Sequence, residues 1–67
     1  MDKSFFEKII GTEVSVTYQD GKKVSYTTGI VQSAIDKFVT IVNSDCAVCI
    51  TYEALLTCRT IANGEEE

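Results

Sequence analysis

An Asp20-Gly21 pair stands between two runs of alternating apolar and polar residues, and it restricts the fold more than any other feature of the chain. The run before the pair covers residues 13–19, and the run after it covers residues 23–32. Asp-Gly between such runs is the strongest short-range signal of a β-hairpin. We therefore expect two antiparallel strands over these ranges. Gly29, inside the second run, predicts a bulge or a sharp bend.

The period of the apolar residues is different before the hairpin. Over residues 3–10 the apolar side chains follow helical spacing, at Phe5, Phe6, Ile9 and Ile10. Gly11 then supplies a stop signal. We expect a short helix over residues 3–10. Because so short a helix does not persist alone in water, its apolar stripe must pack on the rest of the chain, across an open end of the sheet.

Three more segments rich in β-forming residues follow, over residues 37–43, 46–52 and 56–61. Five such short strands cannot form two sheets of useful size. We expect a mostly β fold, in which one strongly bent, five-stranded antiparallel sheet makes an open barrel with the helix at its N-terminal end. Residues 1–62 are expected to form a single domain, followed by an acidic flexible tail over residues 63–67.

Composition limits the classes of function. The 67 residues include no His, the usual acid–base group at neutral pH, and no carboxylate is paired with a nucleophile in a recognisable motif. The net charge of −4 lacks the basic surplus of a strong, nonspecific nucleic-acid binder. No secretory leader and no apolar run of membrane-spanning length is visible. We expect a cytoplasmic protein that is not an enzyme and that uses neither a cofactor nor a membrane.

Cys46 and Cys49 form a C-x-x-C motif. With Cys58 as the only other thiol and no His, a fourth zinc ligand is missing. In a strand over residues 46–52 the two thiols are an odd number of positions apart, so they point to opposite faces. We expect these cysteines to pack in the core or in an interface, because free Cys behaves as a small apolar residue. Metal binding and redox chemistry are the alternatives.

Several segments resemble the Sm-like family, whose barrels are of the SH3-like type. Residues 10–16 with Asp20-Gly21 resemble the opening of the first Sm motif, residues 36–42 are similar to the third strand of the bacterial Hfq type, and residues 50–57 are similar to the second motif. The resemblance covers residues 3–61. It implies a homo-oligomeric ring of about five to seven copies that binds RNA. A small domain with a thin core and open strand edges also favours self-assembly.

The resemblance indicates candidate RNA-binding residues. Phe38 and Tyr52 match aromatic positions and could stack bases, while the basic candidates for phosphate are Lys37, Lys22, Lys23 and Arg59. The Hfq type has Lys and His after the tyrosine, where this chain has Glu53 and Ala54, so the usual uridine pocket is lost or altered. Residues 21–23, 29–31 and 50–57 also resemble the small bacterial Veg-type proteins. That second resemblance implies a protein-interaction or regulatory module without nucleic acid.

Overall fold

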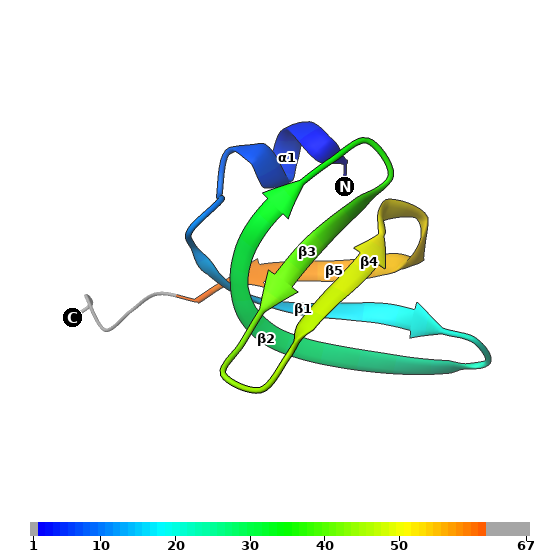
Figure 1. Cartoon of the computed structure of the whole chain (residues 1–67). Coiled ribbons are helices and arrows are strands. Elements are labelled where there is room, and N and C mark those ends of the chain that lie inside the picture. The colour runs from blue at the N-terminus through cyan, green and yellow to red at the C-terminus, as the bar shows by residue number, and fades with distance from the viewer. Residues whose placement is uncertain (1, 62–67) are drawn as a thin grey trace.

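The computed structural model describes residues 2–61 (Figure 1). In chain order the elements are α1 (Lys3–Glu7), β1 (Glu13–Asp20), β2 (Lys23–Ala34), β3 (Phe38–Val42), β4 (Ala47–Thr51), the 3₁₀ turn η1 (Tyr52–Ala54) and β5 (Leu55–Thr60). The strands form one antiparallel sheet in the order β4-β3-β2-β1-β5, strongly bent but not closed into a barrel. The predicted fold class is confirmed. The predicted acidic tail lies outside the described residues.

The helix α1 begins at a capping residue and ends earlier than the apolar spacing predicts. The Asp2 carboxylate accepts a hydrogen bond from the Phe5 N–H at 3.2 Å, which satisfies a free donor of the first turn. Beyond Glu7 the bonding tightens to three-residue spacing, and the Ile9 N–H donates to the Phe6 carbonyl at 3.0 Å. The α-helix therefore ends at Glu7, and the chain turns towards β1 instead of continuing to residue 10.

The β1–β2 hairpin has the geometry that its turn residues favour. Gly21 has a φ of +66° at the first loop position, where a type II′ turn requires a positive φ. Glycine adopts this conformation without the steric cost of a Cβ atom. The pairing then runs uninterrupted from Asp20 and Lys23 to Glu13 and Ile30. The predicted hairpin is confirmed.

Strand β2 curves so that its first part pairs with β1 and its last part pairs with β3 (Figure 1). Gly29 lies in this curve, and a Cβ atom built on it would lie 2.5 Å from the Val42 carbonyl oxygen and 2.9 Å from Ile41 Cγ2. The end of β3 thus crosses Gly29 too closely for any other residue. A register irregularity follows between Val31 and Ser33. The bend predicted at Gly29 therefore has a steric cause.

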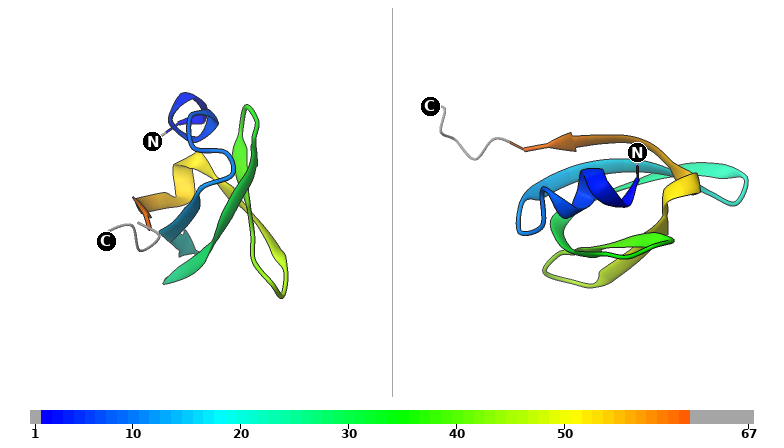
Figure 2. Two further views of the ribbon diagram at one scale, coloured as in Figure 1. Left: turned by 90° about the vertical axis from the view of Figure 1, so that its left-hand side faces the viewer. Right: turned by 90° about the horizontal axis from the view of Figure 1, so that it is seen from above.

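The core lies inside the curve of the sheet, and α1 covers one end of it (Figure 2). The helix and every strand contribute to the buried set, which consists of Phe6, Val14, Val16, Val31, Val39, Ile41, Ile50 and Leu55. In the predicted helical stripe only Phe6 is fully buried, while Ile9 is half-buried and Phe5 and Ile10 are exposed. The helix therefore packs over the sheet as expected, but through a narrower face than the sequence predicts.

Candidate functional site

Three of the six predicted RNA-binding residues lie together at one end of β3 and β4. Phe38 begins β3 opposite Thr51, and Tyr52 follows immediately after β4. The Tyr52 N–H donates to the Lys37 carbonyl at 3.2 Å, which joins the β2–β3 loop to η1. Lys37 is exposed, and Phe38 is half-buried. We call Lys37 and Phe38 the loop surface.

The other three candidates lie elsewhere. Lys22 and Lys23 are at the tip of the β1–β2 hairpin, which projects away from α1 (Figure 1). Arg59 lies near the end of β5, opposite Ser15. Within one copy of the chain, the structure therefore does not gather the predicted basic residues into one patch.

Tyr52 has intramolecular partners for both its hydroxyl and its ring. The hydroxyl donates a hydrogen bond to the Ile35 carbonyl at 2.6 Å. The ring is stacked with Phe6, with centroids 5.9 Å apart and an interplanar angle of 23°. Burial raises the pKa of the Tyr52 hydroxyl. These contacts hold the β2–β3 loop against α1 and η1, which gives Tyr52 a structural role and leaves Phe38 as the more available aromatic.

Replacing Tyr52 with Phe should therefore destabilise the fold by about 1 kcal/mol, the net contribution of one hydrogen bond. A raised pKa in the folded state means that the associated stability is complete below the unfolded tyrosine value and is lost as pH rises through the folded value. The free energy of unfolding should thus fall less steeply above about pH 10 in Tyr52→Phe than in the wild type. Urea unfolding at several pH values measures both effects. Parallel alkaline curves would contradict this role of the hydroxyl.

The electrostatics around the loop surface are mixed. Lys3 Nζ lies 3.3 Å from Asp36 Oδ1 and 3.6 Å from Glu7 Oε2. The hydrogen bond to Asp36 and the two acidic charges raise the pKa of Lys3.

No acidic side chain pairs with Lys37 among the ion pairs of residues 2–61. A hollow of about 310 Å³ beside Lys37 is also lined by Asp36, Thr51, Tyr52 and Glu53. The two carboxylates repel phosphate, so the charges of one copy do not favour nucleic acid at this surface.

The cysteines are more accessible than the sequence predicts. Cys46 and Cys49 are exposed, and only Cys58 is half-buried. Of the two environments expected for these cysteines, the core is therefore wrong for Cys46 and Cys49, and an interface stays a prediction. Cys49 pairs with Thr40 on the outer face of the sheet, 3.6 Å from its hydroxyl, while the next residue, Ile50, faces the core. Burial raises the pKa of the Cys58 thiol. Over residues 2–61, no group of three His, Cys, Asp or Glu side chains could hold a metal ion.

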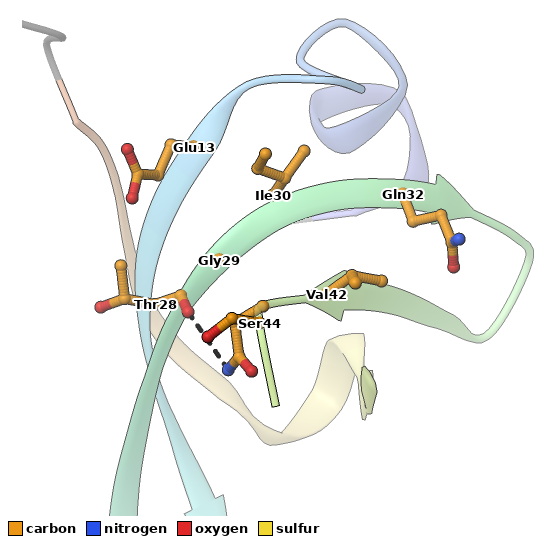
Figure 3. A pocket seen from close by; sticks show the side chains of 8 residues that line it. Glu13, Thr28, Gly29, Ile30, Gln32, Val42 and Ser44 are labelled. Carbon is orange, nitrogen blue, oxygen red and sulfur yellow. Dashed lines mark hydrogen bonds between the residues drawn. The ribbon is translucent and has the colours of Figure 1, made fainter. Parts of the chain in front are cut away.

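A larger hollow, of about 600 Å³, opens on the outer side of the curve of β2 (Figure 3). It is lined by Glu13, Thr28, Gly29, Ile30, Gln32, Val42, Asn43 and Ser44. Asn43 Nδ2 donates to the Thr28 carbonyl at 3.4 Å and so ties the β3–β4 turn to β2. Glu13 is the only charged lining residue. Sequence reasoning did not predict this hollow, and its only sequence signal is Gly29.

The direction of the backbone groups at the two outer strands follows from the hydrogen bonds at their ends. The Asn43 N–H donates to the Cys46 carbonyl, and the Tyr52 N–H donates to the Lys37 carbonyl. Every second residue from Cys46 to Tyr52 therefore directs its backbone groups to β3. The alternate residues of β4 point their N–H and C=O groups to its outer edge; they are Ala47, Cys49 and Thr51. By the same reasoning, the bond from Ile61 to Glu13 directs the groups of Cys58 and Thr60 to the outer edge of β5.

Both edges are open in the described part of the chain, where no strand pairs with the outer side of β4 or β5.

No protein-family model matches the chain, and neither the curated proteins nor the solved structures contain a significant match. No helix of residues 2–61 is long and apolar enough to cross a membrane. The class defined by the fold is a small β-rich domain with a bent, open sheet.

Proposed function

We propose that this chain is a non-catalytic, Sm-like binding protein that works as a homo-oligomeric ring and binds single-stranded RNA on the loop surface. In the ring, β4 of one copy pairs with β5 of the next. The observation that carries the proposal is that the sheet ends in two open edges, each with a row of free backbone groups. Closure of about five to seven copies into a ring would satisfy every such edge.

The composition of β4 supports pairing at its edge. Proteins commonly protect an open edge with charged residues, proline or a bulge. Strand β4 has the sequence Ala-Val-Cys-Ile-Thr, which contains neither a charge nor proline, and its pairing with β3 is regular. The core of the described residues has only eight buried side chains. A domain this small commonly gains stability from partner subunits.

The order of the elements also supports the proposal. A short helix, four strands, a 3₁₀ turn and a fifth strand stand in the order expected from the Sm-like resemblance. The resemblance implies base stacking at Phe38, which belongs to the loop surface. A ring would repeat Lys37 and Phe38 in each copy, so several weak contacts would act together on one strand of RNA.

Replacing Thr51 with Pro should dissociate the assembly while leaving the fold intact. Thr51 has a φ of −69°, close to the value of about −65° that proline requires. Its N–H points to the outer edge, so proline removes a donor between copies and no bond within the copy. We expect the dissociation constant of the assembly to rise about tenfold or more, because each junction loses one hydrogen bond and the proline ring obstructs the pairing strand. Light scattering measures the mass, and urea unfolding measures the stability.

The matched control is Thr51→Ala, which keeps the N–H. The Thr51 side chain makes no capping hydrogen bond, so this change should alter neither mass nor stability beyond about 0.5 kcal/mol. A Thr51→Pro variant that stays folded and keeps the wild-type mass would show that the edge of β4 is not the junction.

The RNA-binding part of the proposal predicts that Lys37→Glu with Phe38→Ala weakens RNA binding about tenfold or more, because one stacked base contributes about 1–3 kcal/mol. Fluorescence anisotropy with labelled oligouridylate and oligoadenylate measures the affinity. Lys22→Glu makes the same charge change as Lys37→Glu at the distant hairpin tip and should weaken binding less than about threefold. Unchanged affinity in the double variant, with the assembly intact, would reject the loop surface as the RNA site.

A protein-interaction module is the second candidate. It is favoured by the carboxylates of Asp36 and Glu53 beside the loop surface and by exposed apolar side chains along the outer face of β2. Val24, Ile30 and Tyr26 lie there, and Tyr26 is 79% exposed. Absence of binding to either oligonucleotide, in a protein that retains its assembly, would favour this second candidate.

A further inference from the structure

The backbone directions at the two edges restrict how β4 of one copy can pair with β5 of the next. Only Ala47, Cys49 and Thr51 present free groups on β4, and Cys58 and Thr60 do so on β5. An antiparallel pairing can therefore shift only in steps of two residues. The register that pairs all five residues of β4 with described residues of β5 sets 47–51 against 60–56. A shift of two residues towards the start of β5 leaves one of these pairs unformed, and a shift of two towards its end leaves two unformed.

This register places Cys49 directly opposite Cys58 of the neighbouring copy. Directly opposed residues of an antiparallel pair project their side chains to the same face. When such a pair exchanges both backbone hydrogen bonds, its Cα atoms lie about 5.5 Å apart. That separation falls within the range of about 4.4–6.8 Å that a disulfide can span.

We propose that the junction between copies pairs Cys49 with Cys58 and that oxidation of these two thiols locks the assembly covalently. The inference rests on the proposed function, because it requires assembly through β4 and β5. It gives that junction a register and a means of regulation. Cys49 and Cys58 then form the junction pair. Cys46 lies before β4 and takes no part in the proposed pairing between copies.

The oxidant is a low-molecular-weight disulfide. The Cys49 thiolate attacks one sulfur of that disulfide, which forms a mixed disulfide and releases one small thiolate. The Cys58 thiolate of the neighbouring copy then attacks Cys49 Sγ, which breaks the mixed disulfide and releases the second small thiolate. Two protein thiols are oxidised, one small disulfide is reduced to two thiols, and the two cysteine protons go to the released thiolates. Of the junction pair, Cys49 reacts first, because it is exposed and Cys58 is half-buried.

The experiment treats the full chain carrying Cys46→Ser with oxidised glutathione and follows it by non-reducing electrophoresis and peptide mass spectrometry. We expect a ladder of covalent oligomers larger than a dimer, with the peptide containing Cys49 linked to the peptide containing Cys58. The ladder should form about tenfold faster than in the same variant with Thr51→Pro, which keeps both thiols but loses their proximity. Adding Cys49→Ser or Cys58→Ser should abolish it.

Light scattering of the reduced Cys46→Ser variant distinguishes failure of this inference from failure of assembly. An assembled protein that gives no Cys49–Cys58 link would overturn the proposed register and leave the proposed function standing. A covalent dimer of the oxidised Cys46→Ser, Cys58→Ser variant would also overturn it. In that dimer Cys49 of one copy would be linked to Cys49 of another, which indicates pairing between two β4 strands. A monomeric protein would reject both the register and the assembly.

Discussion

Replacing Phe6 with Ala is expected to destabilise the domain by about 3–5 kcal/mol, the usual effect of truncating a buried phenylalanine. Phe6 is the largest of the fully buried side chains, with 0% exposure, and its ring is stacked with Tyr52. Its loss leaves a cavity where α1 covers the sheet. A domain of this size has a total stability of only about 3–10 kcal/mol, so much of the variant should be unfolded at 25 °C. Urea unfolding followed by circular dichroism measures the change.

Phe5→Ala is the matched control, because it removes the same side chain one position earlier in the same helix. Phe5 is 39% exposed and touches Phe6 edge to face, with ring centroids 5.0 Å apart. We expect a loss of about 1 kcal/mol. If Phe6→Ala is too unstable to measure, Phe6→Leu should still cost more than Phe5→Leu. Equal effects at the two positions would contradict the burial of Phe6 against the sheet.

The second large effect is expected at Gly29. Gly29→Ala should destabilise the domain by about 2–3 kcal/mol through overpacking, because the added Cβ atom would lie 2.5 Å from a backbone oxygen. Neither Val42 nor β2 can move away without breaking the pairing between β2 and β3. The measurement is the denaturant midpoint together with the slope of the unfolding curve, which should stay unchanged if the folded state keeps its compactness.

Thr28→Ala, at the adjacent exposed position of the same strand, is the control and should change stability by less than about 0.5 kcal/mol. Gly21→Ala separates sterics from backbone strain. Nothing lies within 4 Å of a Cβ atom at Gly21, but its φ is positive, so we expect a loss of about 1 kcal/mol. A wild-type midpoint for Gly29→Ala would show that β3 does not cross β2 at this distance.

Much of the fold could be predicted from local patterns in the sequence. The Asp20-Gly21 pair and the alternating runs around it specify a hairpin, because both the turn and the side-chain period depend on neighbouring residues only. The position of the bend could also be predicted, since a glycine inside a long strand commonly marks a bulge, a bend or the close approach of another backbone. The helix boundary could not, because Ile9 and Ile10 keep helical spacing while the chain is already turning towards β1.

The candidate site was harder to predict, because it depends on contacts between distant segments. The bond from the Tyr52 hydroxyl to Ile35 joins residues 17 positions apart, and no local pattern indicates it. The exposure of Cys49 depends on which face of β4 meets the core, and a shift of one residue reverses that face. The separation of Lys22 from Lys37 follows from the length of β2, because Lys22 precedes its first residue and Lys37 lies in the loop after its last.

The open edges of β4 and β5 connect the structure to the proposed function. One copy of the chain has the carboxylates of Asp36 and Glu53 beside Lys37, the lysine of the loop surface, and is a weak candidate for RNA binding. The proposed ring would change this balance, because it would repeat the loop surface in every copy and place several of these surfaces on one RNA strand. Assembly is therefore the claim on which both the RNA proposal and the cysteine register depend.

The most direct test of assembly is the solution mass of the reduced, full-length protein by light scattering, with absorbance at 260 and 280 nm read on the same peak. Each copy has a mass of 7.4 kDa. The proposal predicts a peak of about 37–52 kDa, which corresponds to about five to seven copies. Nucleic acid in that peak would further support RNA binding. A single peak at 7.4 kDa that persists at high protein concentration would contradict edge-to-edge assembly.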